Sequence, residues 1–459
     1  MPPTATTPVP ARADDAPFSA ADVRALVAVL LAVALASLDT AIANIALPAI
    51  AADLHAQPAA SVWVVNAYQV AVLAVLLPFA ALGDLVGPRR IYLGGLAFFT
   101  AASLACALAP TLALLAAARA LQGIGAGALM SVNIALIRLI YPPARLGRGV
   151  GLNALVVGVS FAVGPSLASL VLSLGSWPWL FAINVPLGLL SLVFAWPALP
   201  RQARRGHGFD PTTALLTAAT FAGLIGALGA AAQREGAWHV GLPLAASLVC
   251  GALLLHRQAG HPAPMLPVDL LRRPMFALSV ATGLASFATQ GLAFVSLPFY
   301  FEDQLHRSAI DTGWLMTPWP VVVALVAPLA GRLSDRYPPG LLGGIGLALL
   351  GVGMAAMATL GPAASGLAIA WRMAVCGLGF GFFQSPNLRA LMASAPPERS
   401  GGASGMIAVT RLTGQATGAA LVALCFGLAG SSGSMWALAL GAAFAAVASV
   451  ASFARLRLA

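Results

Sequence analysis

Residues 36–50 read Ala-Ser-Leu-Asp-Thr-Ala-Ile-Ala-Asn-Ile-Ala-Leu-Pro-Ala-Ile, so one carboxylate, Asp39, stands inside a segment that is otherwise almost entirely apolar. Together with the apolar residues that precede it from residue 24, the segment is long enough to cross a bilayer, which takes about 20 residues. A carboxylate in hydrocarbon is costly unless it is paired, hydrated or protonated. The stretch therefore predicts a transmembrane helix that carries a functional acid.

The whole chain has the composition of a membrane protein. Of its 459 residues, 60% are hydrophobic and 8% are charged, and the mean hydropathy is +0.91. Soluble domains carry about 25% charged residues, so an ordinary soluble fold is excluded. The net charge of +10 comes from arginines scattered over short loops, without the basic stripe of a nucleic-acid-binding protein. We expect the lipid bilayer as a partner, and no nucleic acid.

Fourteen apolar runs are long enough to span a bilayer. The arginines test this number, because short cytoplasmic loops collect basic residues and each span changes the side. With both termini in the cytoplasm, only Arg234 and Arg307 fall in outer loops. Fourteen spans are therefore favoured over thirteen, whereas twelve would leave two apolar runs unexplained. The predicted spans are 24–50, 61–82, 90–109, 111–138, 148–174, 178–198, 212–232, 239–257, 274–301, 311–333, 340–360, 363–393, 402–429 and 434–454.

Three patterns occur twice along the chain. They are inner-loop motifs at 80–90 and 331–340, Gly-x-Gly-x-Gly at 123–127 and 377–381, and a pair of glycines with equal spacing, Gly151 with Gly164 and Gly405 with Gly418. Two homologous halves explain these repeats, and many secondary transporters are built from such repeats around a midplane site. The chain is predicted to be an all-α polytopic membrane protein with a disordered cytoplasmic tail at 1–23, six-helix halves at 24–198 and 273–456, and a linker at 199–272 with two inserted helices.

These motifs resemble the major facilitator superfamily, and within it the fourteen-span drug:proton antiporter branch of the EmrB and QacA type. The resemblance covers nearly the whole chain after residue 24. The motifs that carry it are residues 38–48, 82–90, 119–125, 164–165 and 179–188. The resemblance implies the major facilitator fold and proton-coupled transport of a small-molecule substrate, with the proton gradient as the energy source and no cofactor.

Asp39 and Arg119 are the predicted proton-coupling residues. At 1.5 Å per residue they lie roughly 16 and 12 Å from the outer ends of their helices, so their side chains can meet. A nearby arginine favours the ionised carboxylate, whereas burial favours the protonated one. A group balanced between the two can bind and release a proton. The alternative is a permanently ionised pair that only fixes packing.

Charged residues of the two inner-loop motifs suit an ionic latch at the cytoplasmic face. Loop solvation and membrane topology are the alternative explanation for these charges. The predicted gating residues are Asp84, Arg89, Arg90, Asp335 and Arg336.

The antiporter motif of the fifth span contains Gly151, Gly158, Gly164 and Pro165. Small residues allow close contact between helices, and a Pro is tolerated where neighbouring helices support the bend. We expect this helix to approach its neighbour closely, although general helix packing explains the glycines equally well.

A substrate cavity is expected between the halves. Asp39 is the only deep acid, so neutral, zwitterionic and weakly anionic substrates stay open beside cationic drugs. The predicted lining residues are Asn44, Asn66, Tyr68, Gln122, Gln290, Trp314, Trp319, Arg372, Gln384, Asn387 and Arg411.

The sequence thus predicts a secondary transporter that exports drugs or other small amphipathic compounds in exchange for protons. We expect a monomer in a bacterial inner membrane that works by alternating access. A proton symporter or facilitator that imports a small metabolite is the main alternative, and a non-transporting scaffold or receptor is a distant one. The histidines show no metal-ligand or catalytic pattern, and no phosphate-binding loop occurs, so neither a metal site nor an enzyme is expected.

Overall fold

The computed structural model describes residues 19–142, 145–200, 210–232, 236–258, 268–361, 363–396 and 400–457, and within these ranges all regular structure is helical. The N-terminal helices are α1 (Ala20–Asp53), α2 (Pro58–Ser61), α3 (Trp63–Val86), α4 (Pro88–Ala107), α5 (Leu112–Ile140), α6 (Leu146–Leu174), α7 (Pro178–Ala182) and α8 (Asn184–Ala198). The middle segment contains α9 (Pro211–Ala232), α10 (Ala237–Gln258) and the short helix η2 (Val268–Arg272). The C-terminal helices are α11 (Pro274–Phe299), η3 (Tyr300–Gln304), α12 (Ala309–Met316), α13 (Pro318–Leu333), α14 (Pro339–Ala358), α15 (Gly366–Ser394), α16 (Ser400–Ala429), η5 (Gly430–Ser432), α17 (Gly433–Ala454) and η6 (Arg455–Arg457).

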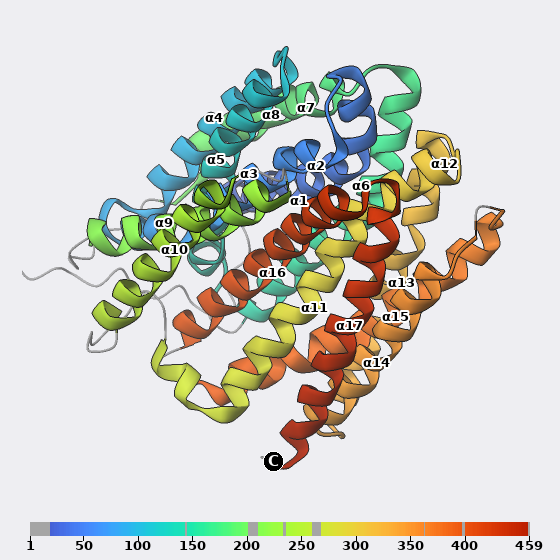
Figure 1. The fold of residues 1–459 in the computed structure, drawn as a ribbon. Coiled ribbons are helices and arrows are strands. Elements are labelled where there is room, and N and C mark those ends of the chain that lie inside the picture. The colour runs from blue at the N-terminus through green and yellow to red at the C-terminus, as the bar shows by residue number, and fades with distance from the viewer. Residues whose placement is uncertain are drawn as a thin grey trace, which may run out of the picture.

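The described residues contain 13 segments that are long and apolar enough to cross a membrane. The last of them, Gly405–Arg457, has 53 residues and includes both α16 and α17, which η5 separates. The figure of fourteen crossings and the cytoplasmic position of both termini stay predictions. Figure 1 shows the long helices as one bundle. We call its two ends the Ala20 end and the Asp53 end, after the two ends of α1.

The first helix begins earlier than expected. The predicted disordered tail covers 1–23, of which 1–18 lie outside the described residues. Residues 20–23 are helical, because Ser19 forms a capping box: its backbone N–H donates to Asp22 Oδ2 over 2.8 Å, and its hydroxyl oxygen accepts from the Asp22 N–H over 3.2 Å. Such a reciprocal pair satisfies amides that have no partner at a helix start.

Glycines of α5 and α15 pack in the same pattern in the two halves. In α5, a Cβ on Gly123 would lie 2.4 Å from the Tyr68 carbonyl oxygen of α3, and one on Gly125 would lie 2.6 Å from Phe99 of α4. In α15, a Cβ on the corresponding Gly377 would lie 2.4 Å from a backbone atom of α13, and one on Gly379 would lie 2.4 Å from a backbone atom of α14. These contacts explain the duplicated Gly-x-Gly pattern. Each of the two helices packs between two neighbours, and their backbones approach so closely that a larger residue at these positions would clash.

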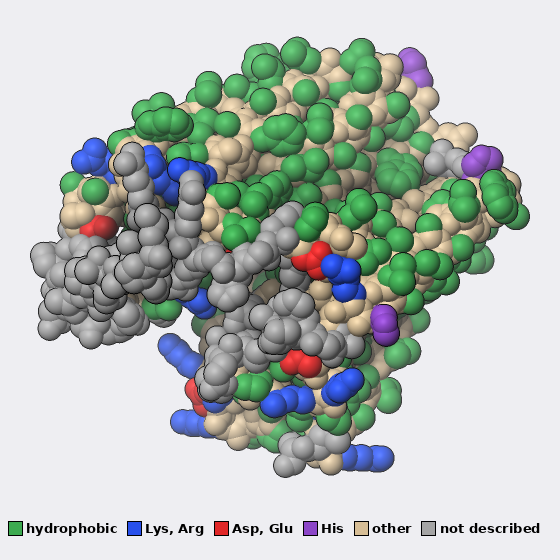
Figure 2. Space-filling model, turned by 90° about the vertical axis from the view of Figure 1, so that its left-hand side faces the viewer, with side chains coloured by type: hydrophobic (Ala, Val, Ile, Leu, Met, Phe, Trp, Pro, Cys, Tyr) green, Lys and Arg blue, Asp and Glu red, His purple; other side chains and the backbone are tan. Residues whose placement is uncertain are grey.

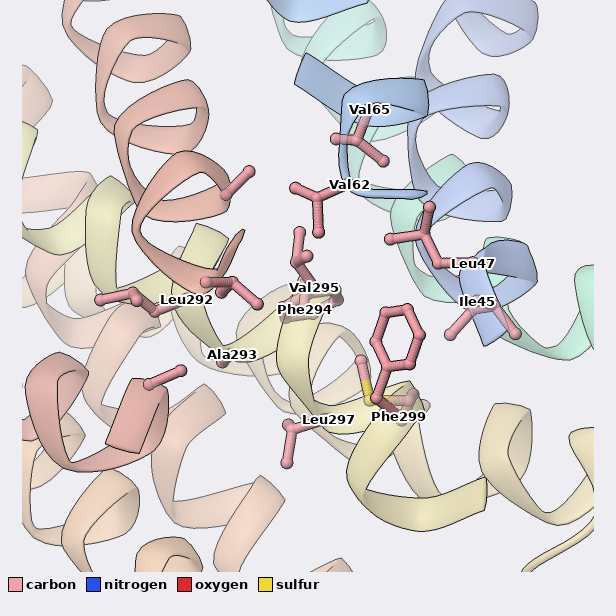
Figure 3. Packing of buried hydrophobic residues seen from close by; sticks show 14 of the residues in the cluster. Ile45, Leu47, Val62, Val65, Leu292, Ala293, Phe294, Val295, Leu297 and Phe299 are labelled. Carbon is pink, nitrogen blue, oxygen red and sulfur yellow. The ribbon is translucent and has the colours of Figure 1, made fainter. Parts of the chain in front are cut away.

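A shared apolar core joins the two halves near the Asp53 end. It includes Ile45 and Leu47 of α1, Val62 before α3, and Val295 and Phe299 of α11. Figure 3 shows Val295 of α11 directed toward Val62, and the Phe299 ring directed toward Ile45 and Leu47. The apolar residues of 36–50 are thus used for packing between the halves as well as for crossing the bilayer.

The inserted helices α9 and α10 form an antiparallel pair beside α3 and α16. A Cβ on Gly229 of α9 would come within 2.4 Å of the Trp63 ring, and one on Gly427 of α16 within 1.9 Å of the Ala232 carbonyl oxygen. Helix α10 packs mainly on α9, and Leu248 on its other face is 66% exposed. Figure 2 shows apolar side chains over much of the upper and right-hand parts of one face of the molecule, with charged groups mainly on its left and lower parts. An apolar surface of this extent fits contact with lipid.

The pair formed by α9 and α10 carries an acid whose charge is strongly stabilised. Asp210 Oδ2 accepts from Thr213 Oγ1 over 2.6 Å and from Arg257 Nε over 3.1 Å. The hydrogen bond from Thr213 and then the bond from Arg257 lower the pKa of Asp210 to about 2. The ionised carboxylate therefore stabilises the pair above the unfolded-state pKa of about 3.9, and this contribution is lost as pH falls toward the folded value.

We expect the difference in Tm between wild type and Asp210→Asn, measured in detergent, to be constant from about pH 8 to about pH 5 and to shrink below about pH 4. Asp311→Asn, which changes an acid at the start of α12, is the control. A difference that grows as the pH falls would contradict this assignment.

Candidate functional site

Asp39 lies at the centre of a buried polar network, and its direct partners come from α5 and α8. Arg119 Nη1 of α5 donates to Asp39 Oδ2 over 2.5 Å, and both side chains are only 1% exposed. The other carboxylate oxygen, Oδ1, accepts from Gln122 Nε2 over 2.8 Å and from Asn184 Nδ2 of α8 over 2.9 Å. The carboxylate thus has one cationic and two neutral donors, which is the satisfaction that a buried charge requires.

Arg119 is held by groups beyond Asp39. Its Nε donates to the Val64 carbonyl oxygen over 3.0 Å, and its Nη1 also lies 2.5 Å from Gln122 Oε1. The guanidinium carbon lies 4.2 Å from the centre of the Tyr68 ring, a cation–π contact. Because α3, α5 and α8 all contribute, the pair can open only if these helices move relative to α1 or if the carboxylate is protonated.

A cavity of about 180 Å³ lies next to this network, on the other side of Tyr68. Its walls come from α1, α3, α5 and α6 of the N-terminal half and from α16 of the C-terminal half. Tyr68 lines the cavity and also contacts Arg119, and its hydroxyl lies 3.4 Å from the Ala36 carbonyl oxygen. Tyr68 is therefore the side chain through which an occupant of the cavity would affect the Asp39 pair.

Some of the predicted lining residues do face a cavity. Tyr68 and Arg411 line the larger one, and Asn44 and Gln290 line a neighbouring space of about 20 Å³. Gln122 belongs to the Asp39 network instead. Asn66 and Gln384 border neither of the two cavities.

Four further residues that the sequence predicts in the cavity line neither of these two cavities: Trp314, Trp319, Arg372 and Asn387. Trp314 is 63% exposed on the outside of the bundle, and Trp319 is packed in the core. Arg372 Nε donates to the Ala356 carbonyl oxygen over 3.0 Å, at the Asp53 end. Asn387 Oδ1 accepts from Arg455 Nη1 over 2.7 Å, at the Ala20 end. Helix rotation and depth decide these positions, and a residue type alone does not reveal them.

Several polar residues at the site were not predicted as site residues. Gln69, Asn133, Asn153 and Gln415 line the cavity, and Asn184 binds Asp39. Each stands in an apolar span, and polar groups in a membrane helix usually face the bundle interior. That signal was present in the sequence for all of these amides.

The predicted latch is not formed among the described residues. Asp84 is exposed without a hydrogen bond or ion pair to any of them, and Arg90 and Arg336 are exposed as well. Arg89 Nη2 donates to the Trp196 carbonyl oxygen over 2.6 Å. Asp335 pairs with Arg389 of α15, within its own half. The charges therefore tie neighbouring helices in each half, and a latch between the halves stays a prediction for another conformation.

Two glycines of the antiporter motif do not make the expected close contact. A Cβ on Gly151 or Gly158 would meet no atom within 4 Å, so the prediction of close packing was wrong there. At Gly164 a Cβ would lie 2.5 Å from Ala41 Cβ of α1. The repeat-related Gly418 packs on α11 with a corresponding distance of 2.3 Å to the Ala288 carbonyl oxygen. Close packing is thus found only at the second glycine of each pair.

Pro165 and the residues after it form the contact between the halves at the Asp53 end. Ser169 Oγ donates to the Ala309 carbonyl oxygen of α12 over 2.7 Å, and Ser166 Oγ lies 2.9 Å from Thr317 Oγ1. A Cβ on Gly313 would lie 1.7 Å from Ser169 Oγ and 2.5 Å from the Pro165 carbonyl oxygen. Helix α12 can therefore dock on α6 only because residue 313 has no side chain.

Gly313→Val is expected to prevent this docking and to remove most transport, because overpacking of a tight contact costs about 1–3 kcal/mol or more. The measurement is substrate flux in proteoliposomes. Gly94→Val is the matched control, since a Cβ there would meet no atom within 4 Å. Normal flux by the Gly313 variant would show that this contact is not needed in the transport cycle.

The sequence profile described as Major Facilitator Superfamily matches residues 29–419. The chain belongs to this superfamily. It is 49% identical over 430 residues, 93% of this chain and 94% of the relative, to a protein of Escherichia coli (strain K12) described as uncharacterized transporter YebQ. It is 29% identical to the riboflavin transporter RibZ of Clostridioides difficile (strain 630), over 87% of each chain. It is 31% identical to the tetracenomycin C resistance and export protein of Streptomyces glaucescens, over 86% of this chain and 74% of that one.

Solved structures agree with the fold. A crystal structure of a POT family transporter in complex with a thioalcohol-conjugated peptide superposes with a TM-score of 0.73, covering 95% of this chain and 96% of that one at 14% identity. At this identity the likeness concerns the fold alone. The superfamily and the relatives identify this chain as a multi-pass membrane transporter and not an enzyme.

Proposed function

We propose that this protein is a proton-coupled exporter of small amphipathic compounds, with Asp39 as the proton-binding group. The observation that carries the proposal is the position of the Asp39–Arg119 pair, which is buried and contacts Tyr68, a side chain that lines the cavity. Protonation of Asp39 would release Arg119, whose ring contact with Tyr68 reaches the cavity wall. Protonation of Asp39 therefore changes the affinity of the cavity for its substrate, and substrate binding changes the affinity of Asp39 for a proton. This reciprocal effect is the requirement for coupling.

Alternating access is supported by the two-fold repeat and by the position of the cavity. The cavity is bounded by both halves, so a rocking motion of one half against the other changes the side to which it opens. The contact of α6 with α12 is the part that would separate when the Asp53 end opens.

The proposal also covers the membrane in which the protein lies and the side on which its termini lie. The arginine distribution supports cytoplasmic termini, and the bacterial relatives support the inner membrane. We propose a monomer of the fourteen-span branch, with two helices, α9 and α10, inserted between the halves. The proton gradient is the energy source.

Import by proton symport is the second candidate, because one relative is a riboflavin transporter. The direction of movement separates the two. Inside-out vesicles that contain the protein would be given an acidic interior, and riboflavin, ethidium and benzoate offered outside. An exporter accumulates its substrate as protons leave the vesicle, and a symporter moves substrate and protons together.

The proposal is supported if a protonophore abolishes accumulation of at least one compound and protein-free vesicles show none. Movement of substrate and protons in the same direction would replace export by import. Movement that is insensitive to the gradient would replace both by facilitated diffusion.

A further inference from the structure

The charge of the larger cavity is positive and has no counter-ion among the described residues. Arg411 of α16 is the one charged side chain in its wall. It forms no hydrogen bond or ion pair with any described residue. Asp39, the acid of the adjacent network, is occupied by Arg119 and does not line the cavity. An arginine in such a place favours an anionic occupant and disfavours a cationic one.

The amide groups around Arg411 do not bind it. Gln69 Oε1 and Asn133 Oδ1 are buried and have no hydrogen-bond partner among the described residues. The amide nitrogens of Gln415 and Asn133 are already used, donating to Gln290 Oε1 over 2.9 Å and to Asn153 Oδ1 over 2.8 Å. None of these amide groups pairs with Arg411, so its guanidinium stays available to an anionic ligand.

The remaining wall is apolar and partly aromatic. Tyr68 and Phe161 face the cavity, together with Val72, Leu76 and Met130. The volume of about 180 Å³ compares with the roughly 150 Å³ that is known to admit one benzene molecule. In this conformation the cavity therefore suits a single aromatic ring with a small polar substituent.

We propose that the cavity binds aromatic organic acids, with the carboxylate or phenolate of the substrate paired to Arg411. This inference rests on the proposed function, since it takes the cavity to be the transport site. Arginine binds a carboxylate through two parallel N–H donors, which adds orientation as well as affinity. The like charge of Arg411 excludes lipophilic cations, so discrimination comes from repulsion as well as attraction.

Binding of three compounds of equal shape tests the charge preference. They are benzoate, benzamide and benzamidine, which are anionic, neutral and cationic at neutral pH. With the purified full-length protein in detergent, we expect wild type to bind benzoate at least about tenfold more tightly than benzamidine, the ratio expected from one charge-assisted hydrogen bond. Arg411→Gln is expected to remove this preference, and Arg411→Lys to keep part of it.

The variants have a matched control in Arg372→Gln. Arg372 is the arginine of the second repeat, bonded to carbonyl oxygens outside the cavity, so its loss should leave the benzoate preference unchanged. Arg411→Gln is expected to fold, because Arg411 is only partly buried and has no ion-pair partner among the described residues that its removal would leave unpaired. Three results would overturn the inference. They are benzamidine binding to wild type as tightly as benzoate or more tightly, an unchanged benzoate preference in Arg411→Gln, and no binding of any of the three compounds.

Failure of this inference and failure of the proposed function are distinguishable. Gradient-driven export of ethidium without a benzoate preference would leave the exporter in place and remove the anion site. A benzoate preference that depends on Arg411, without gradient-driven flux of any compound, would keep the anion site and remove proton-coupled export.

Discussion

Asp39→Asn is expected to reduce gradient-driven transport to the level of protein-free vesicles. An amide cannot carry the proton that a carboxylate binds and releases, and the described part of the chain has no second acid in this network. Because the substitution also leaves Arg119 buried without a counter-ion, the free energy of unfolding should fall by about 3–5 kcal/mol. Flux under an imposed pH gradient and thermal unfolding in detergent measure the two effects separately.

A double variant separates coupling from stability. Asp39→Asn/Arg119→Gln removes both charges, so we expect it to regain much of the lost stability while transport stays absent. Asp53→Asn is the control on the same helix, since Asp53 Oδ2 only accepts from Trp177 Nε1, over 2.7 Å at the helix end. If the double variant still transports against a gradient, the pair has a packing role and the proton is carried elsewhere.

Ser166→Cys/Thr317→Cys is expected to arrest transport completely when it is oxidised. The two hydroxyl oxygens are 2.9 Å apart, and a disulfide joins sulfur atoms at about 2.05 Å, so little movement is needed to form the bond. The bond would hold α6 against α12 and keep the Asp53 end closed. Reduction should restore flux, which distinguishes a reversible lock from damage to the fold.

The native cysteines need a control in this experiment. All four are free, and three of them are buried. Each single variant, Ser166→Cys and Thr317→Cys, should therefore keep its flux under oxidation. Complete cross-linking, measured by mass spectrometry, together with undiminished flux would exclude separation of α6 and α12 as a step of transport.

Most of the helices could be predicted because a bilayer imposes local requirements. A membrane helix must satisfy its own backbone hydrogen bonds and must be apolar over its full length. Both properties are visible in consecutive residues, as in 36–50. The duplicated glycine motifs were predictive for a similar reason, since close contact between helices needs small residues at fixed spacing.

The candidate site could be predicted only in part. Depth along two helices was enough to place Asp39 within reach of Arg119, and the structure brings them together. Depth says nothing about which way a helix is turned, so Trp314 was expected in the cavity and lies on the outside. The amides that complete the site could have been suspected from their polarity, but not assigned to one cavity.

The sequence by itself determined that this protein is a helical membrane transporter with one deep acid, because hydrophobic length, arginine sidedness and repeated motifs are local or additive properties. Only the tertiary structure decided that the acid is fully paired and that Arg411 is left without a partner in the cavity. The physical reason is that helix rotation and crossing are set by many weak contacts between distant segments. Those contacts decide which charges meet.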